Sequence, residues 1–432
     1  MDLDCWFDFF ELSEEAELHA SDLRHAGLNA RLFWPNTPIQ VTPCLVYESM
    51  IARQSETYSL LFDALLQLPD VLFDGDYPKF AEAVGFCSAS LSDLLTEPGD
   101  GLLPCRWDLC QRDSQWFAFE ANFGGALGGL PTDEMQALYD ALPLPDGQFC
   151  DSWASAGQSI AQSFVRRFGA ADKWQLVVVD DANAYQDSPL TAKSAARLMS
   201  RHLGQDIEAI AHTDLDEFAK TVTKPLVAFE LFTLSDIAKA ADDSYGPYLS
   251  RCADGTLQRG ISLLCDLYMS KACLALLHEA ADRKLYDPFT CAAIHSAIPK
   301  TVVVSADKLT DLRQLPKDRY VLKSAIGYGG NAVFCGWEQP SDRWAELLQD
   351  AGNLSGQNGL CVLQHRVEGE RAPSLSFMPD GIWIESDAPQ VLGIFQIDGQ
   401  LCGGAVRQAI TGDGVANAAR RASIGVIRRV SG

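Results

Sequence analysis

The chain has 432 residues, a length that allows two or three packed units. Hydrophobic residues make up 47% of it and charged residues 21%, a balance typical of globular proteins. Acidic residues outnumber basic ones by 58 to 34, which gives a net charge of −24. This charge argues against a nucleic-acid partner, because binding to a phosphate backbone depends on lysine and arginine.

The N-terminal segment, residues 1–8, is acidic and lacks the basic stretch of a secretory signal, and no apolar run is as long as a membrane span. We therefore expect a cytoplasmic protein with no membrane partner. The 13 cysteines are odd in number and contain no C-x-x-C pair, so the sequence predicts neither a zinc site nor a disulfide framework. The sequence leaves the oligomeric state open.

Residues 1–150 form the first predicted zone. Apolar patterning predicts helices over 7–27 and 47–68 and a strand over 39–46. The zone ends in two further strands that carry polar side chains, and the sequence Pro-Asp-Gly at 145–147 predicts the turn that leads out of it.

The two polar strands at the end of this zone carry Arg106 with Asp108, and Glu120 with Asn122. Residues two apart on a strand face the same side, so Glu120 and Asn122 share a face. Carboxylate and amide oxygens suit Mg²⁺, and the glycines at 124–125 let a backbone pass close to a ligand. The pattern predicts a magnesium–phosphate site, although a solvated strand end has the same composition.

The second zone, residues 151–296, alternates strands and helices. A continuous apolar run at 174–183 predicts a buried parallel strand, and a helix over 194–204 and a strand over 225–230 follow it. This pattern indicates an α/β unit. A dinucleotide-binding fold is the alternative, but no G-x-G-x-x-G follows Asp180.

The third zone, residues 297–432, becomes two-stranded and rich in glycine. Its segment 318–336 reads as a strand that ends near Lys323, a glycine-rich turn and a second strand. Backbone N–H groups of glycines and a lysine charge suit phosphate, although an ordinary hairpin remains an alternative. The turn contains Gly327, Tyr328, Gly329 and Gly330.

These segments together resemble the ATP-grasp superfamily, and their order resembles its circularly permuted branch, which includes glutathionylspermidine synthetase-like amide ligases. In ordinary ATP-grasp enzymes the lysine and the glycine-rich loop precede the metal pair, whereas here they follow it by about two hundred residues. The resemblance implies an α/β fold: a circularly permuted ATP-grasp fold with a Rossmann-like central unit. Further matching segments lie at 270–279, 298–301, 362–370 and 392–407.

The sequence departs from the glutathionylspermidine synthetases at two places. Where those enzymes resemble Asn-Ala-Asp-Thr-Pro after the metal pair, this chain continues from Asn122 with Phe-Gly-Gly-Ala-Leu-Gly-Gly at 123–129. The N-terminal part also shows no clear amidase domain. The loop near the acyl acceptor is therefore different, and a second, hydrolytic function is not indicated.

The resemblance implies ATP and Mg²⁺ as cofactors and assigns roles to residues of this chain. The implied metal ligands are Asp108, Glu120 and Asn122. The implied catalytic residues are Arg106, beside the transferred phosphoryl group, and Arg407. The implied nucleotide-binding residues are Lys271 and Lys323 for phosphates, the turn Gly327–Gly330, Gln364 and Val367 for adenine, and Glu368 with Glu370 for ribose. The two glutamates could equally belong to a solvated hinge.

The implied activity is ligation of a carboxylate to an amine through an acyl phosphate. The expected partners are the carboxylate and amine substrates, which are amino acids or a short peptide in a biosynthetic pathway. Two alternatives stay open: a glutathionylspermidine synthetase-like ligase that uses a polyamine, and a catalytically silent module that only binds nucleotide.

Overall fold

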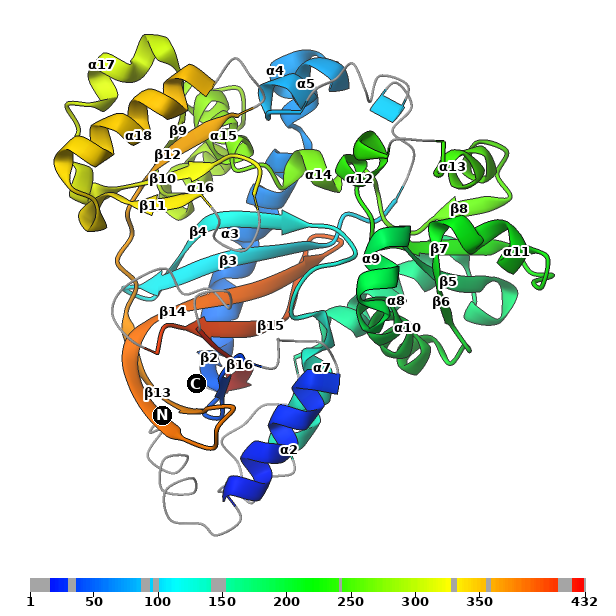
Figure 1. Cartoon of the computed structure of the whole chain (residues 1–432). Helices are drawn as coiled ribbons and strands as arrows, with labels where there is room; N and C mark the ends of the chain where they lie inside the picture. Colours follow the sequence, from blue (N-terminus) through cyan, green and yellow to red (C-terminus); the bar gives the residue numbers. More distant parts are fainter. Residues whose placement is uncertain are drawn as a thin grey trace.

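Three β-sheets form the framework of the protein in the computed structural model (Figure 1). The structure describes residues 16–29, 36–86, 94–95, 101–140, 153–240, 243–327, 332–354, 359–410 and 422–430. Parallel and antiparallel strands are combined with helices, which confirms the predicted mixed α/β class.

The largest sheet has the strand order β13-β1-β16-β15-β14-β3-β4, with β2 paired to β16. Its strands are β1 (Ile39–Gln40), β2 (Cys44–Tyr47), β3 (Cys105–Arg112), β4 (Gln115–Phe123), β13 (Arg371–Phe377), β14 (Trp383–Ile397), β15 (Gln400–Gln408) and β16 (Ser423–Val430). Because β3 pairs with β14, strands from both ends of the chain build one sheet. The predicted strand over 39–46 is two short strands that are separated at Pro43, which has no backbone N–H to donate.

Helix α3 (Glu48–Leu66) packs against the large sheet, and α2 (Ala16–Asn29) packs against α7 (Asp133–Asp140) below it (Figure 1). The predicted helix over 47–68 is confirmed, and the one over 7–27 is confirmed for its described part. Residues 1–15 and the predicted turn at 145–147 lie outside the described residues.

A second sheet, with the order β6-β5-β7-β8, is parallel throughout. Its strands are β5 (Gln175–Asp180), β6 (Glu208–Ala211), β7 (Leu226–Glu230) and β8 (Leu257–Arg259). Its helices are α8 (Ala156–Phe168), α9 (Ala182–Asp187), α10 (Pro189–Leu203), α11 (Leu215–Ala219), α12 (Leu234–Lys239) and α13 (Gly246–Ala253). The parallel strands predicted in the middle zone are confirmed.

The third sheet is antiparallel, with the order β11-β10-β12-β9. Its strands are β9 (Thr301–Val304), β10 (Tyr320–Ser324), β11 (Val333–Cys335) and β12 (Cys361–His365). The nearby helices are α4 (Leu68–Phe73), α5 (Tyr77–Ala83), α14 (Cys265–Tyr268), α15 (Ala272–Asp282), α16 (Pro288–Ala297), α17 (Leu309–Leu312) and α18 (Ser341–Leu354). Pairing of β10 with β11 confirms the predicted hairpin.

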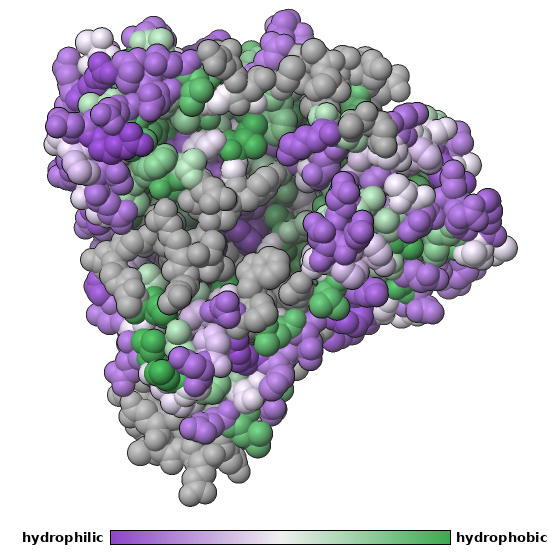
Figure 2. Space-filling view, in the orientation of Figure 1, coloured by the Kyte–Doolittle hydropathy of each residue, from purple (hydrophilic) through white to green (hydrophobic). Residues whose placement is uncertain are grey.

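On the face shown in Figure 2, hydrophilic side chains predominate at the outer edges of the units built on the second and third sheets. Among the described residues, no helix has the length and apolar content needed to cross a membrane. The cysteines of the described residues are free thiols.

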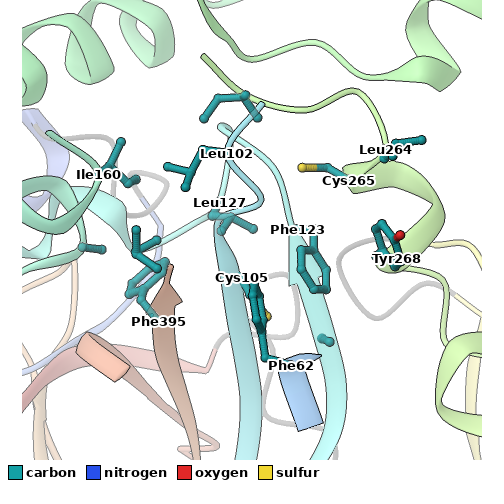
Figure 3. Close-up of a cluster of buried hydrophobic side chains, with 14 of the residues drawn as sticks. Phe62, Leu102, Cys105, Phe123, Leu127, Ile160, Leu264, Cys265, Tyr268 and Phe395 are labelled. Carbon is teal, nitrogen blue, oxygen red and sulfur yellow. The ribbon is translucent and has the colours of Figure 1, made fainter. Parts of the chain in front are cut away.

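Aromatic side chains fill the core where the large sheet meets the helices. The rings of Phe62 and Phe123 stack 6.0 Å apart, and Tyr268 lies 5.9 Å from Phe123 on its other side (Figure 3). Ala121 and Phe123 of β4 belong to this core, on the face of the strand opposite Glu120 and Asn122. The core therefore supports the strand that carries these two residues.

A buried polar bridge ties α3 to the large sheet. The indole N–H of Trp107 donates to Gln396 Oε1 at 2.6 Å, and Gln396 Nε2 donates to the carbonyls of Tyr58 (3.2 Å) and Gly399 (2.9 Å). The Tyr58 and Trp107 rings meet edge to face at 5.3 Å. One amide therefore bonds to the Trp107 N–H and to two backbone carbonyls.

Replacing Gln396 by Leu should lower the free energy of unfolding by roughly 2–3 kcal/mol, because the buried Trp107 N–H loses its acceptor. Urea unfolding of the variant and the parent measures the change. Gln162→Leu, at an exposed position of α8, is the matched control and should leave the midpoint nearly unchanged. Equal losses in the two variants would argue against the bridge.

Candidate active site

The hairpin of β3 and β4 places the predicted metal residues together. Asp108 pairs with Glu120 in the strand register, and Arg106 pairs with Asn122. These four side chains share the face opposite the buried Trp107, as the two-residue period requires. The sequence-based prediction that they form a cluster is therefore matched by the register.

A cleft of about 720 Å³ lies where the three sheets meet. All predicted site residues among the described ones except Glu370 line it: Arg106, Asp108, Glu120, Asn122, Lys271, Lys323, Gly327, Gln364, Val367, Glu368 and Arg407. Tyr328, Gly329 and Gly330 lie outside the described residues. Segments that are far apart in the sequence thus contribute to one site.

The two candidate ribose residues differ in position. Glu368 lines the cleft, with its carboxylate 3.3 Å from Arg366 and largely exposed. Glu370 is not among the residues lining the cleft; its carboxylate accepts hydrogen bonds from Asp113 N (2.6 Å) and Gln111 Nε2 (3.0 Å) at the β3–β4 turn. The structure therefore gives Glu370 a role in holding that turn.

Asp108 lies between two guanidinium groups. Its Oδ1 accepts from Arg106 Nε at 2.9 Å, and its Oδ2 lies 2.6 Å from Arg407 NH2 and 3.3 Å from Arg106 NH2. Burial acts to raise the pKa of Asp108, but the charges of Arg106 and then Arg407 outweigh it and hold the pKa at about 2. The carboxylate is therefore ionised at neutral pH and fixes both arginines.

Gly393 of β14 leaves room for this arrangement. It pairs with Asp108 in the register, and a Cβ at this position would lie 3.1 Å from Arg106 Cδ and 3.4 Å from Arg106 Nε. The absence of a side chain on the intervening strand lets Arg106 lie flat across the sheet. Sequence reasoning missed Gly393, because strand order decides which glycine lies under the arginine.

The glycine-rich loop after β4 is anchored on both sides. Arg106 NH1 donates to the carbonyl of Gly128 at 2.6 Å. A Cβ on Gly125 would lie 2.1 Å from the carbonyl oxygen of Glu230, at the end of β7, so only glycine fits there. The loop is therefore held between the arginine cluster and the parallel sheet.

Residues after β7 form a wall of the cleft that the sequence analysis did not assign. Thr233, Ser235 and Asp236 line it, together with Asp266 of α14. They follow the carboxyl end of a parallel strand, where α/β proteins bind ligands. Because the middle zone was predicted to be α/β, the segment after its strand at 225–230 could have been predicted to line a binding site.

Lys271 connects α15 with the metal strand. Its Nζ lies 2.9 Å from Glu120 Oε1 and donates to the carbonyl of Gly327 at 3.1 Å. Its backbone N–H donates to the carbonyl of Ala325, at the end of β10, at 2.9 Å. The lysine is thereby fixed between Glu120 and the start of the glycine-rich turn.

Lys323 is buried between two sheets. Its Nζ donates to Gln364 Oε1 at 2.7 Å and to the carbonyl of Phe119 at 3.3 Å. Burial lowers the pKa of Lys323 to about 8; the Lys271 charge acts in the same direction, and Glu120 opposes it. The side chain joins the third sheet to the edge of the large one.

The oxygen donors fit a magnesium ion that is shared with phosphates. Within the described ranges, no three His, Cys, Asp or Glu side chains are grouped to hold a metal, and the predicted site instead offers Asp108, Glu120 and the Asn122 amide. Mg²⁺ is commonly held by one or two carboxylates together with phosphate oxygens. Both carboxylates are ion-paired here, Asp108 with two arginines and Glu120 with Lys271. A bound metal ion would therefore compete with these side chains for the carboxylate oxygens.

Comparisons with known proteins support the fold. No family model and no curated protein sequence matches the chain. Among solved structures, a glutathione synthetase-like effector from Globodera pallida, in its apo form, matches with a TM-score of 0.56 and 13% identity, over 96% of this chain and 97% of that one. The chain therefore has a fold similar to that of this glutathione synthetase-like protein. This agrees with the resemblance predicted from the sequence, and at this identity the match carries no residue roles.

Replacing Asp108 by Asn should destabilise the protein in a pH-dependent way. The folded pKa of about 2 lies below the unfolded value of about 3.9, so the charge contributes fully above the unfolded value and its contribution is lost as pH falls through the folded one. We expect the parent to melt at a higher temperature than the variant at neutral pH, and the gap to shrink between about pH 4 and pH 2.

Thermal unfolding of both proteins across that range measures the gap. Asp172→Asn, at an exposed position, is the matched control and should show no such gap. A gap that widens on acidification would contradict the ion pairs of Asp108.

Proposed function

We propose that this chain is an ATP- and Mg²⁺-dependent carboxylate–amine ligase whose ATP-grasp elements follow a circularly permuted order. The observation that supports it best is the convergence of two arginines, two lysines and three oxygen donors on one cleft. These groups come from β3, β4, β10, β15 and the start of α15.

The concentration of cations is informative because the chain as a whole is strongly acidic, with a net charge of −24. Arg106, Lys271, Lys323 and Arg407 all line the same cleft. A cationic cleft in an acidic protein favours an anionic ligand locally while the remaining surface repels it. A nucleoside triphosphate is such a ligand.

The proposed roles of the residues combine the resemblance to ATP-grasp ligases with their positions in the cleft. In a ligase of this type, ATP supplies the phosphoryl group that turns a carboxylate into an acyl phosphate, and Mg²⁺ neutralises phosphate oxygens. Asp108, Glu120 and Asn122 are the residues that would hold the metal. Arg106 and Arg407, oriented by Asp108, would stabilise negative charge on the transferred group.

The remaining part of the cleft would receive the nucleoside and the phosphates. Lys271 and Lys323 would bind phosphate oxygens, and Gly327 lines the cleft in contact with Lys271. Val367 and Glu368, after β12, line the same cleft and would lie beside the adenine and ribose. These assignments rest on the resemblance to ATP-grasp ligases together with the positions of the residues.

Amino acids or a short peptide are the proposed substrates. The related solved structure is described as glutathione synthetase-like, and that description supports peptide-type substrates for this chain. The glycine-rich loop at 124–129 and the wall at 233–236 form the part of the cleft where substrates would meet the arginines.

Nucleotide product analysis tests the proposal. With ATP, Mg²⁺ and a mixture of amino acids, the protein should form ADP and phosphate, because the proposed acyl-phosphate mechanism transfers the terminal phosphoryl group. AMP and pyrophosphate as the main products would overturn the residue roles. Nucleotide binding without turnover, with amino-acid and polyamine mixtures alike, would identify a silent module instead.

Glu120 and Asn122 should behave as one unit. Glu120→Gln and Asn122→Ala should each lower kcat by about a hundredfold, with a smaller effect on nucleotide affinity, because both act on the transferred group. The double variant should be little worse than the poorer single one. Steady-state kinetics measures this, with Glu279→Gln at an exposed position of α15 as the control. Independent, additive losses would argue against a shared metal.

A further inference from the structure

A chain of buried hydrogen bonds runs from Lys323 into the protein interior. Lys323 Nζ donates to Gln364 Oε1 at 2.7 Å, Gln364 Nε2 donates to Thr301 Oγ1 at 2.9 Å, and Thr301 Oγ1 donates to the carbonyl of Pro299 at 2.7 Å. The exposed fractions of Lys323, Gln364 and Thr301 are 8%, 3% and 1%. Buried polar groups in such a chain hold one another in place.

The direction of this chain is fixed at its inner end. The carbonyl of Pro299 can only accept a hydrogen bond, so the Thr301 hydroxyl donates its single proton to it. The same hydroxyl must then accept a hydrogen bond from Gln364. The amide nitrogen of Gln364 therefore faces Thr301, and its oxygen faces Lys323. His278 Nε2 also contacts the Pro299 carbonyl, at 3.2 Å, and burial lowers the pKa of His278 to about 4, so it donates as a neutral ring.

The ammonium group of Lys323 has three N–H donors. The structure assigns one to Gln364 Oε1 and one to the carbonyl of Phe119. Phe119 is the extra residue of a bulge in β4, where the register passes from Glu120 to Ala118, and its carbonyl is therefore available outside the strand ladder. Two fixed acceptors leave one N–H direction for a ligand in the cleft.

We infer that Gln364 and Thr301 are positioning residues that aim the Lys323 ammonium at a phosphate group, and that Gln364 does not contact adenine. Both ends of the Gln364 amide are already engaged within the protein. A neutral amide also leaves the lysine charge uncompensated and available to an anion, whereas a glutamate would pair with it. The inference rests on the proposed nucleotide-binding function.

The test is a comparison of nucleotide affinities by calorimetric titration with a non-hydrolysable ATP analogue, ADP and adenosine. Gln364→Met and Thr301→Val should each weaken the ATP analogue and ADP about tenfold, since a hydrogen bond to a charged group is misdirected. Adenosine has no phosphate, and its affinity should stay within about twofold. Thr301→Ser keeps the hydroxyl and should restore the affinity for the ATP analogue.

A double-mutant cycle separates positioning from direct contact. In a Lys323→Met background, Gln364→Met should cost less than about twofold in affinity for the ATP analogue, because no ammonium remains to be aimed. Thr191→Val, at an exposed position of α10, is the matched control for loss of a threonine hydroxyl. Circular dichroism and thermal melting check that each variant is folded.

Other outcomes would overturn the inference. Equal losses for adenosine and the ATP analogue, or a full loss from Gln364→Met in the Lys323→Met background, would show that Gln364 contacts the base. Unchanged affinities in folded Gln364→Met and Thr301→Val proteins would show that neither residue positions Lys323. If the unchanged protein binds no nucleotide, the proposed function fails and this inference fails with it.

Discussion

The ion pairs of Asp108 are the constraint on which the site depends. An ionised carboxylate in the interior loses its hydration and needs partners that compensate for it; Asp108 is paired twice, with Arg106 of its own strand and with Arg407 of β15. The strand between them, β14, carries Gly393 at the crossing, so the three strands and the two guanidinium groups form one rigid unit. The position of Arg106 in turn fixes the glycine-rich loop through the Gly128 carbonyl.

Lysines perform a similar task between the sheets. Lys271 joins α15 to Glu120, and Lys323 joins β10 to the bulge at Phe119. Both contacts are made to β4, the edge strand of the large sheet. The strands of the third sheet do not pair with β4, so side chains make this connection. The cleft is therefore held by charged side chains that the proposed ligands would also use.

Local patterns in the sequence predicted the elements and which residues share a face. The strand with Glu120 and Asn122 and the hairpin around Lys323 were predictable because alternation and turn residues are local signals. Local patterns could not predict the contacts of Gly393 and Thr301 or the wall after β7. These features depend on the order of the strands and on how separate sheets meet. The break at Pro43 was missed although proline is itself a local signal of a break, because its nitrogen cannot donate to a strand ladder.

The same charges also explain why the site can be stable before ligands arrive. Asp108 pairs with both Arg106 and Arg407, and Glu120 pairs with Lys271, so each of these charges has a partner of opposite sign. If the proposed function is correct, the carboxylates would bind a divalent cation, and the arginines and lysines would bind phosphate oxygens. A phosphate group that binds alone would be repelled by the two carboxylates, and a cation that binds alone would be repelled by the guanidinium groups. Such an exchange of partners favours the joint binding of nucleotide and metal over either one alone.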